Sequence, residues 1–306
     1  MKRAGETRAT PSAERGGSSH HPTLRDITSQ MSRLLAKSGV ESHHLDAQLI
    51  VAHALGIDRL DIYRNPDLPV NTRQQAAVRS RISRRASGIP TAYITGTKEF
   101  WSLPISVDER VLIPRPETEL LVEEALAAAR TLPPEVKILE IGTGSGAVSL
   151  ALGVELVNAR IVSTDVSDDA LKVAAANISA HGLTDRVGLK QGDLFAALEP
   201  DERFALIVSN PPYLTDEEME GLTTEVRAEP RGALWGGRDG LSVIERLIRG
   251  APDRVEAGGF LIFEIGSGQQ QAVGRLIDET DGLVFSHMRN DYAGHPRVVA
   301  ARRIDR

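Results

Sequence analysis

Short apolar runs alternate with helix-like segments over residues 136–302 of this 306-residue chain. The runs predict strands at residues 136–141, 160–164, 187–190, 204–209, 259–265, 283–288 and 298–302. Between them, apolar residues recur at helical spacing at residues 145–156, 168–181, 241–255 and 269–279. This alternation predicts an α/β fold, in which helices cover both faces of a mostly parallel sheet. Ligands of such sheets bind beyond the carboxyl ends of the strands, so the turns that follow the strands are the candidate sites.

The N-terminal part of the chain has helical spacing only. Leu24, Ile27 and Met31 recur at intervals of one helical turn. Thr23 and Asp26 match a capping box, in which each of the two side chains accepts a hydrogen bond from the other's backbone. No convincing strand pattern appears before Tyr93, so a small all-helical domain is expected here.

Changes in composition divide the chain into segments. Gly, Ser, Pro and His dominate the first residues, which is typical of disorder. Strand-like pieces between Tyr93 and Val111 are broken by Gly96 and Pro104, which predicts a hairpin. The predicted organisation is a disordered extension at 1–22, a helical substrate-docking domain at 23–90, a linker hairpin at 91–113 and the α/β domain at 114–306.

Composition narrows the possible classes of site. The chain has no cysteine, which excludes disulfides, thiolate metal sites and cysteine nucleophiles, and which suits a reducing cytoplasm. The longest apolar runs are far shorter than a membrane span, so we expect no membrane partner. His43, His44 and His53 have no further ligands at zinc spacing, so no metal site is predicted.

The charge balance argues against DNA as a direct partner. The formal net charge is −6, whereas contacts to phosphates require clustered Lys and Arg. One stretch, residues 71–98, has six basic residues and no acidic ones. We interpret it as a solvated helix face rather than a docking patch for a partner, although both readings remain open.

The turn after the first predicted α/β strand is rich in glycine. It reads Glu140-Ile141-Gly142-Thr143-Gly144-Ser145-Gly146. Glycines at alternate positions allow a sharp bend and a close approach of the backbone to a ligand, although tight helix–strand packing also uses glycine. The dinucleotide-binding pattern needs a further glycine where this chain has Ala147, so that pattern is not met. A turn of this spacing preceded by an acid is instead typical of enzymes that bind S-adenosylmethionine.

Further candidate cofactor contacts follow the next two strands. Asp165 ends the second strand, and its carboxylate can accept hydrogen bonds from both hydroxyls of a ribose. Asp193 and Leu194 are expected to end the third strand, where an adenine would lie. Glu140 is expected to contact the amino-acid end of the cofactor or to support the turn.

The fourth strand ends in the most specific motif of the chain, Ser209-Asn210-Pro211-Pro212-Tyr213. Asn-Pro-Pro-Tyr after an apolar strand is the signature of methyltransferases that act on a nitrogen conjugated to a π system. Such a nitrogen is a poor nucleophile, so the site has to hold both of its N–H bonds. The side-chain oxygen of Asn210 and the backbone carbonyl of Pro211 can accept these bonds and stabilise the positive charge that develops. The prolines fix the backbone, and Tyr213 offers a flat face for the planar group.

With these motifs in view, the sequence resembles bacterial peptide chain release factor glutamine N5-methyltransferases over residues 23–303. Besides the cofactor turn and Asn-Pro-Pro-Tyr, the resemblance rests on Tyr93-Ile94-Thr95-Gly96 with Glu99-Phe100, Leu112-Ile113-Pro114-Arg115-Pro116-Glu117-Thr118-Glu119, Glu229-Pro230 with Ala233-Leu234, Gly236-Gly237-Arg238-Asp239-Gly240-Leu241, and Glu264-Ile265-Gly266 with Gln269.

The resemblance implies a Rossmann-like class I methyltransferase fold, with a mostly parallel seven-stranded sheet and a small N-terminal all-helical domain. The implied reaction is methyl transfer from S-adenosyl-L-methionine to the glutamine of the Gly-Gly-Gln loop in class I peptide chain release factors, which the N-terminal helices would dock. The implied catalytic residues are Asn210, Pro211 and Tyr213. The implied cofactor-binding residues are Glu140, Gly142, Thr143, Gly144, Ser145, Gly146, Asp165, Asp193, Leu194 and Asn210, and the implied substrate-binding residues are Asn210, Pro211, Pro212, Tyr213, Arg115 and Glu117.

This chain departs from the family pattern at one cofactor position. Leu194 stands where some relatives carry an aromatic residue, so weaker stacking on the cofactor is expected. Three other functions remain open at this point. They are glutamine methylation of a ribosomal protein, methylation of adenine N6 or cytosine N4 in a nucleic acid, and a catalytically silent binding module.

Overall fold

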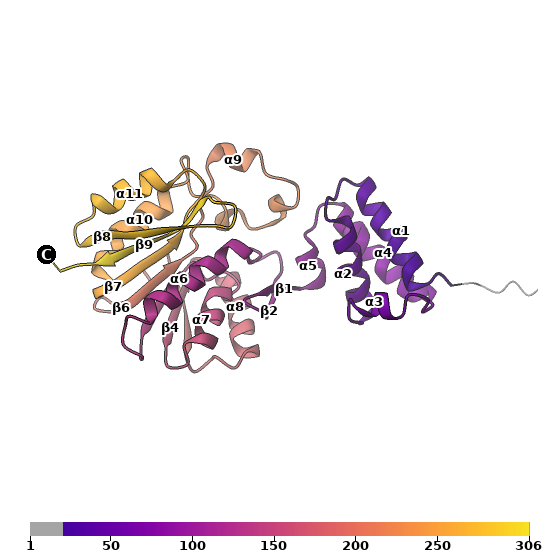
Figure 1. Ribbon diagram of the computed structural model, residues 1–306, viewed down its shortest axis with the longest axis horizontal. Coiled ribbons are helices and arrows are strands. Elements are labelled where there is room, and N and C mark those ends of the chain that lie inside the picture. Colours follow the sequence, from indigo (N-terminus) through magenta and orange to yellow (C-terminus); the bar gives the residue numbers. More distant parts are fainter. Residues whose placement is uncertain (1–20, 306) are drawn as a thin grey trace, which may run out of the picture. The chain divides into compact units, whose positions relative to one another are not determined.

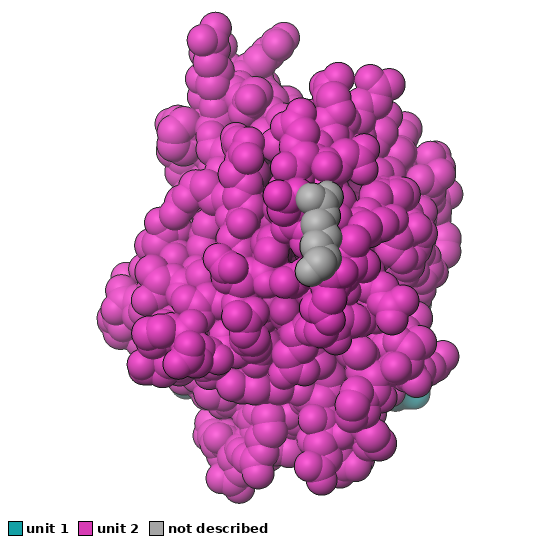
Figure 2. All heavy atoms as spheres, turned by 90° about the vertical axis from the view of Figure 1, so that its left-hand side faces the viewer, with its two compact units in different colours: residues 1–83 teal, residues 84–306 magenta. Residues whose placement is uncertain are grey.

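The computed structural model describes residues 21–305 (Figure 1). These residues form two compact units, the first ending at Ser83 and the second beginning at Arg84, and Figure 2 gives them separate colours. The boundary falls inside helix α4 (Thr72–Ala86). The predicted extension at 1–22 lies outside the described residues except for His21 and Pro22. The predicted division at 23–90, 91–113 and 114–306 stays a prediction.

The first unit is built from α1 (Leu24–Lys37), α2 (His43–Leu55), α3 (Asp61–Arg64) and most of α4. The capping box is present at the start of α1, where the Asp26 backbone N–H donates to Thr23 Oγ1 at 3.2 Å and the Thr23 N–H donates to Asp26 Oδ2 at 3.0 Å. Apolar side chains one helical turn apart, including Leu24 and Ile27, are fully buried. The expected all-helical N-terminal domain is therefore confirmed.

Arg85 contradicts the interpretation of the basic stretch as a wholly solvated face. Its side chain is only 4% exposed, and its Nη2 lies 2.7 Å from Glu225 Oε2 within the second unit. Arg79 and Arg84 on the same helix are exposed, as expected. A count of nearby charges could not reveal the burial of Arg85, because its carboxylate partner is 140 residues away in the sequence.

The second unit begins with α5 (Thr91–Thr95), followed by a hairpin of β1 (Thr97–Phe100) and β2 (Leu103–Ser106). Tyr93 to Thr95 were expected to be strand-like, and this was wrong. The Pro90 carbonyl accepts the Tyr93 and Ile94 N–H groups at 3.1 and 3.2 Å, which starts a helical turn. Gly96 ends it with φ +72°, a conformation that favours glycine.

A seven-stranded sheet with the order β5-β4-β3-β6-β7-β9-β8 forms the centre of the second unit. Its strands are β3 (Lys137–Ile141), β4 (Arg160–Asp165), β5 (Val187–Gln191), β6 (Phe204–Ser209), β7 (Val255–Glu264), β8 (Leu283–Asn290) and β9 (Pro296–Arg303). All pairings are parallel except those of β9 with β7 and β8. The predicted mostly parallel seven-stranded sheet is confirmed.

Helices cover both faces of this sheet (Figure 1). The covering helices are α6 (Glu119–Ala129), α7 (Ala147–Glu155), α8 (Asp168–Ala180), α10 (Ser242–Gly250) and α11 (Gln270–Asp278). Shorter helices complete the unit, namely η1 (Pro116–Thr118), α9 (Asp216–Glu220), η2 (Val226–Ala228), η3 (Arg231–Ala233) and η4 (Ala251–Asp253). Alternate strand residues point to opposite faces. Ile138 therefore packs in the cluster of α6, α7 and α8, and its neighbour Leu139 packs in the cluster of α10 and α11. Full burial of side chains of this size stabilises the fold by about 1.5–3 kcal/mol each.

The chain reverses its direction of travel across the sheet after β5. From β3 it continues outward to β4 and β5, and then returns to β6 on the other side of β3. The carboxyl ends of β3 and β6 therefore flank the position where a parallel α/β sheet opens a crevice for ligands. The two motifs singled out in the sequence follow these two strands.

Candidate active site

A cavity of about 420 Å³ lies at the carboxyl ends of β3, β4 and β6. Twelve of the fifteen site residues expected from the sequence line it, namely Arg115, Glu140, Gly142, Thr143, Gly144, Ser145, Asp165, Asp193, Leu194, Asn210, Pro211 and Pro212. The other three, Gly146, Glu117 and Tyr213, are not among its lining residues. The volume is within the range of small-molecule and cofactor sites.

The glycine turn after β3 contains three left-handed residues, Gly142, Gly144 and Gly146. Gly142 has φ +75° and Gly144 has φ +54°, a region that side chains with a Cβ rarely adopt. The Gly142 and Thr143 N–H groups donate to the Thr164 carbonyl at 2.8 and 3.0 Å, which fixes the turn against β4. Gly146 has φ +81° and also packs closely, because a Cβ there would lie 3.3 Å from the Ala174 Cβ on α8.

Asp165, the last residue of β4, is joined to this turn. Its Oδ2 accepts the Gly144 N–H at 2.9 Å, and its Oδ1 accepts the Ser167 N–H at 2.9 Å. Burial raises the pKa of this carboxyl. Each oxygen of a carboxylate has a second lone pair, so Asp165 can still accept hydrogen bonds from two hydroxyl groups in the cavity.

Glu140 is buried beneath the turn, with 2% of its surface exposed. Its Oε2 accepts hydrogen bonds from Thr143 Oγ1, at 2.7 Å, and from Ser149 Oγ. Burial raises the pKa of Glu140 to about 7, although these donors oppose the shift. The side chain thus supports the turn from below while also lining the cavity.

The third strand, β5, ends at Gln191, so Asp193 and Leu194 lie in the turn after it and do not end the strand as expected. Leu194 has φ +51°, a left-handed backbone conformation that is uncommon for residues other than glycine. Asp193 Oδ2 lies 2.6 Å from Arg246 Nη2 on α10. Both residues nevertheless line the cavity.

Asn210 and Pro211 offer two hydrogen-bond acceptors at the cavity. The Asn210 Nδ2 donates to Thr118 Oγ1 at 3.1 Å. Within residues 21–305, no hydrogen bond uses the Asn210 Oδ1 or the Pro211 carbonyl oxygen. Two acceptors in adjacent residues can therefore receive the two N–H bonds of a primary amide.

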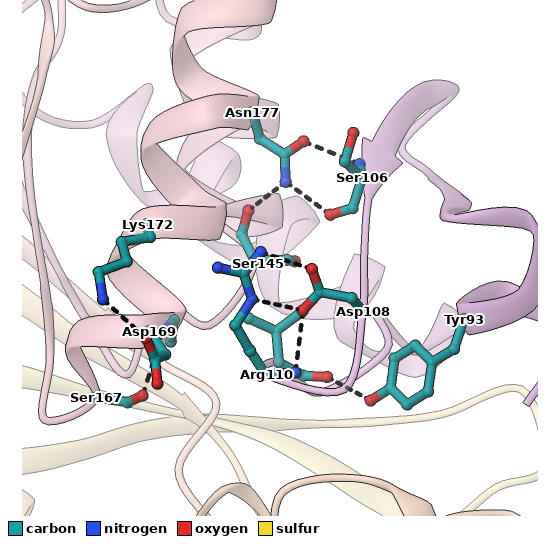
Figure 3. Close-up of polar contacts among 11 residues, drawn as sticks. Tyr93, Ser106, Asp108, Arg110, Ser145, Ser167, Asp169, Lys172 and Asn177 are labelled. Atoms are coloured by element: carbon teal, nitrogen blue, oxygen red, sulfur yellow. Dashed lines mark hydrogen bonds and ion pairs between the residues drawn. The ribbon is translucent and has the colours of Figure 1, made fainter. Parts of the chain in front are cut away.

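Asn177 on α8 connects the hairpin to the glycine turn (Figure 3). Its Oδ1 accepts the Ser106 N–H at 2.9 Å, and its Nδ2 donates to the Ser106 and Ser145 carbonyls, both at 2.9 Å. The residue is 1% exposed. A single side chain thereby holds the end of β2 against a turn that lines the cavity.

We expect Asn177→Leu to lower the free energy of unfolding by about 2–4 kcal/mol. The substitution keeps the branched shape but leaves the buried Ser145 carbonyl and the partly buried Ser106 N–H and carbonyl without this partner. An unpaired group costs roughly 1–3 kcal/mol when it is fully buried, and less when water can reach it. Urea denaturation measures the effect. The exposed Asn158 provides the matched control, because Asn158→Leu should change the free energy by no more than about 0.5 kcal/mol. Equal effects of the two substitutions would show that the Asn177 contacts contribute nothing special.

Residues 110–115 form one wall of the cavity, which we call the rim segment. Glu229, with 1% of its side chain exposed, holds it through Arg115 Nη2 at 2.5 Å and the Ile113 N–H at 3.0 Å. The Tyr93 hydroxyl donates to the Val111 carbonyl at 2.6 Å. Arg115 was expected from the sequence, whereas no function had been assigned to Glu229 or Tyr93.

Residues of the Gly-Gly-Arg-Asp-Gly-Leu segment pack directly on the Asn-Pro-Pro-Tyr turn. A Cβ on Gly236 would come 2.7 Å from the Pro212 carbonyl, and one on Gly240 would come 2.2 Å from the Tyr213 carbonyl. Gln269 Nε2 donates to the Tyr213 and Gly240 carbonyls at 3.0 and 3.1 Å. In the sequence this motif is only a marker of resemblance, and its contacts in the fold explain the glycines.

Two kinds of feature are absent from residues 21–305. Among residues 21–305, no helix combines the length and the apolar composition that crossing a bilayer requires. Over the same range, no three His, Asp or Glu side chains are grouped so that they could hold a metal ion. The neighbouring His43 and His44 instead place their Nδ1 atoms 3.0 and 2.9 Å from Ser32 Oγ.

Comparison with known proteins gives matches to both units. The profile of the PrmC N-terminal domain matches residues 26–96, and that of the methyltransferase small domain matches residues 116–234. The chain is 41% identical over 271 residues to the release factor glutamine methyltransferase of Rhodopirellula baltica, covering 87% of this chain and 92% of that protein. It is also 41% identical over 281 residues to the protein of the same name from Geobacter sulfurreducens, covering 92% and 96%.

A solved methyltransferase from Pyrococcus furiosus has a similar fold. The TM-score is 0.52 at 17% sequence identity, and the match covers 74% of this chain and 99% of that one. At this identity the likeness concerns the fold alone. The assignment of a family rests on the sequence relatives.

Proposed function

Because this chain belongs to the family of release factor glutamine methyltransferases, we propose that it methylates the side-chain amide nitrogen of the glutamine in the Gly-Gly-Gln loop of class I peptide chain release factors. The chain is a protein-glutamine N5-methyltransferase that uses a methyl donor of the S-adenosylmethionine type. One observation connects the proposed reaction with this cavity. The two unused acceptors, Asn210 Oδ1 and the Pro211 carbonyl, line the same cavity as the glycine turn and Asp165.

Positioning is the main task of a site that methylates an amide. The nitrogen lone pair is delocalised into the amide carbonyl and is perpendicular to the plane of the N–H bonds. Holding both N–H bonds therefore directs the lone pair at the methyl group of the donor. Asn210 Oδ1 and the Pro211 carbonyl can accept these two N–H bonds and stabilise the charge that grows on nitrogen. Pro211 and Pro212 restrict the backbone, so the carbonyl is oriented before the substrate arrives. Holding the reacting atoms in line supplies much of the rate.

The residues of the cavity fit S-adenosyl-L-methionine. Asp165 would accept hydrogen bonds from its ribose hydroxyls, the left-handed Gly142 and Gly144 would allow close backbone approach, and Leu194 would contact the adenine. Glu140 would lie nearest the charged amino-acid end, where its raised pKa would be lowered again by an ammonium group. When bound, this cofactor supplies an electrophilic methyl group on a sulfonium.

The remaining expected substrate-binding residues differ in whether they line the cavity. Arg115 lines the cavity and is fixed by Glu229, so it would contact the loop that carries the glutamine. Pro212 lines the cavity as well. Tyr213 and Glu117 are proposed to act from behind the lining residues. The family relation favours a release factor over a ribosomal protein or a nucleic acid, and we expect the enzyme to act in the cytoplasm, where translation takes place.

The decisive experiment offers three substrates to the purified protein with methyl-labelled cofactor. These are a class I release factor, the same factor with its loop glutamine replaced by alanine, and duplex DNA. We expect label on the intact factor only. Label on DNA alone would overturn the substrate assignment, and label on both release factors would place the modification at another residue. Should no label appear on any of them, the release factor proposal fails, and ribosomal proteins become the substrates to test.

A further inference from the structure

A chain of polar groups lies behind Asn210. Asn210 Nδ2 is 3.1 Å from Thr118 Oγ1, and Thr118 Oγ1 is 2.8 Å from Glu264 Oε2. Thr118 ends η1 and Glu264 ends β7, so three separate elements contribute to the chain. Thr118 is 5% exposed and Glu264 is 1% exposed. Their hydrogen bonds are therefore protected from exchange with solvent.

The direction of each hydrogen bond follows from the donors available. An ionised carboxylate can only accept, so the single hydroxyl hydrogen of Thr118 is donated to Glu264. Thr118 Oγ1 is then left as an acceptor, and the Asn210 atom facing it has to be the NH2 group. The amide of Asn210 is thereby assigned by its partners, with its nitrogen toward Thr118 and its oxygen available to a ligand.

Glu264 has further partners that stabilise its charged form. The Tyr213 hydroxyl donates to Glu264 Oε1 at 3.1 Å, and the positive charge of Arg297 acts on the same carboxylate. Burial raises the pKa of Glu264 to about 6, with these contacts opposing the shift. Above that pH the carboxylate is ionised and accepts from Thr118. Tyr213 thus contacts the carboxylate that accepts from Thr118, and the flat face expected of it from the sequence stays a prediction.

We propose that Thr118 and Glu264 are positioning residues that fix the carboxamide of Asn210 with its oxygen, and not its nitrogen, toward the substrate amide. The inference rests on the proposed function, because the orientation matters for a substrate that presents two N–H bonds. The terminal torsion of an asparagine is broad and roughly two-fold, so an unsupported amide would populate both orientations. In the reversed orientation, N–H groups of the enzyme would face N–H groups of the substrate.

The test compares Thr118→Val, which keeps the shape but removes the hydroxyl, with Thr118→Ser, which keeps the hydroxyl. We expect Thr118→Val to lower kcat about tenfold, while the Kd of S-adenosylmethionine changes by less than about twofold. Thr118→Ser should retain most of the activity. Thr280→Val is the matched control, since it removes another buried threonine hydroxyl bond, to the Leu276 carbonyl at 2.6 Å, from a residue that does not line the cavity.

A double-mutant cycle separates positioning from a general loss of structure. If Thr118 acts through Asn210, Thr118→Val should cause no further loss of kcat in the Asn210→Ala background. The same tenfold loss in that background would overturn the inference. Wild-type kcat in the Thr118→Val single variant would overturn it as well.

NMR of the asparagine side-chain amides tests the inference in the absence of substrate. The chain has only six asparagines, so selective ¹⁵N labelling gives a simple spectrum of side-chain amides. The Asn210 signals are assigned by their absence in Asn210→Ala. They should shift and lose protection from hydrogen exchange in Thr118→Val, and should be restored in Thr118→Ser. Unchanged signals would contradict the positioning role even if the release factor is methylated. A failed methylation assay would contradict the proposed function but would leave this spectroscopic result valid.

Discussion

Replacing Asn210 with alanine is expected to lower kcat by about 10²–10³-fold while leaving the affinity for the cofactor within about twofold. The magnitude is that of removing one preorganised polar group from a site of charge development. Asn210 Oδ1 and the Pro211 carbonyl are the two adjacent acceptors that we propose hold the substrate amide, and the Pro211 carbonyl cannot hold both N–H bonds alone. The substrate would still bind through the rim segment, so the loss should appear in kcat more than in KM.

Single-turnover kinetics with labelled cofactor measures this effect, and calorimetry measures the cofactor affinity. Asn290→Ala serves as the control, because Asn290 is an exposed residue on β8. Normal turnover by Asn210→Ala would rule out the amide-holding role. A large loss of cofactor affinity in that variant would instead move Asn210 from the substrate side of the cavity to the cofactor side.

Asp165→Ala is expected to act on the other half of the reaction and to raise the Kd of S-adenosylmethionine by about 10²-fold or more. Hydrogen bonds to a charged acceptor contribute about 1.5–3 kcal/mol each, and tenfold in Kd corresponds to about 1.4 kcal/mol. The substitution also removes the acceptors of the Gly144 and Ser167 N–H groups, so the glycine turn should loosen. At saturating cofactor, kcat should recover toward the wild-type value.

Asp165→Asn separates these two causes. Asparagine keeps one acceptor oxygen and the size of the side chain, so its effect on Kd should be intermediate. Asp193→Asn controls for charge, since Asp193 also lines the cavity but is paired with Arg246. Unchanged calorimetric affinity of Asp165→Ala would remove Asp165 from the cofactor site, and equal effects of the Asp165→Asn and Asp193→Asn variants would assign the effect to charge alone.

Features that depend on neighbouring residues could be predicted from the sequence. The strands of the sheet are short apolar runs between helical patterns. The turns after β3 and β6 contain motifs whose residue types indicate the chemistry of the site. Because parallel strands bring their carboxyl ends to one edge, residues as distant as Gly142, Asp165 and Asn210 could be expected in one place. The cavity does bring these three together.

Features that depend on distant partners could not be predicted in this way. Thr118 and Asn210 are 92 residues apart, and Asn177 and Ser106 are 71 residues apart. The spacing of apolar residues along the sequence gives no indication of such pairs. Glu264 was visible only as part of a recognised motif, without any indication that it would accept the Thr118 hydroxyl. The roles of the supporting residues therefore emerge only from the folded chain.

Local signals also failed where two of them conflicted. The apolar and β-branched residues of Tyr93-Ile94-Thr95 favour a strand. Pro90 before them and Gly96 after them favour a helical turn with a left-handed end, and these flanking residues prevail. The Tyr93 side chain is consequently buried, with its hydroxyl on the rim segment.

The pairing of β3 with β6 has a consequence for how such an enzyme can diversify. Ile141 is in register with Ser209, whose Oγ donates to the Ile141 carbonyl at 2.8 Å, so Gly142 and Asn210 emerge side by side from the sheet. Neighbouring strands are about 4.8 Å apart, and a slip of one residue would displace one motif by about 3.3 Å. The backbone hydrogen bonds between β3 and β6 thus fix the distance between the two motifs, and with it the separation of methyl donor and acceptor. Surface loops can then change in sequence, or be redesigned for another planar amide, without changing the distance over which the methyl group is transferred.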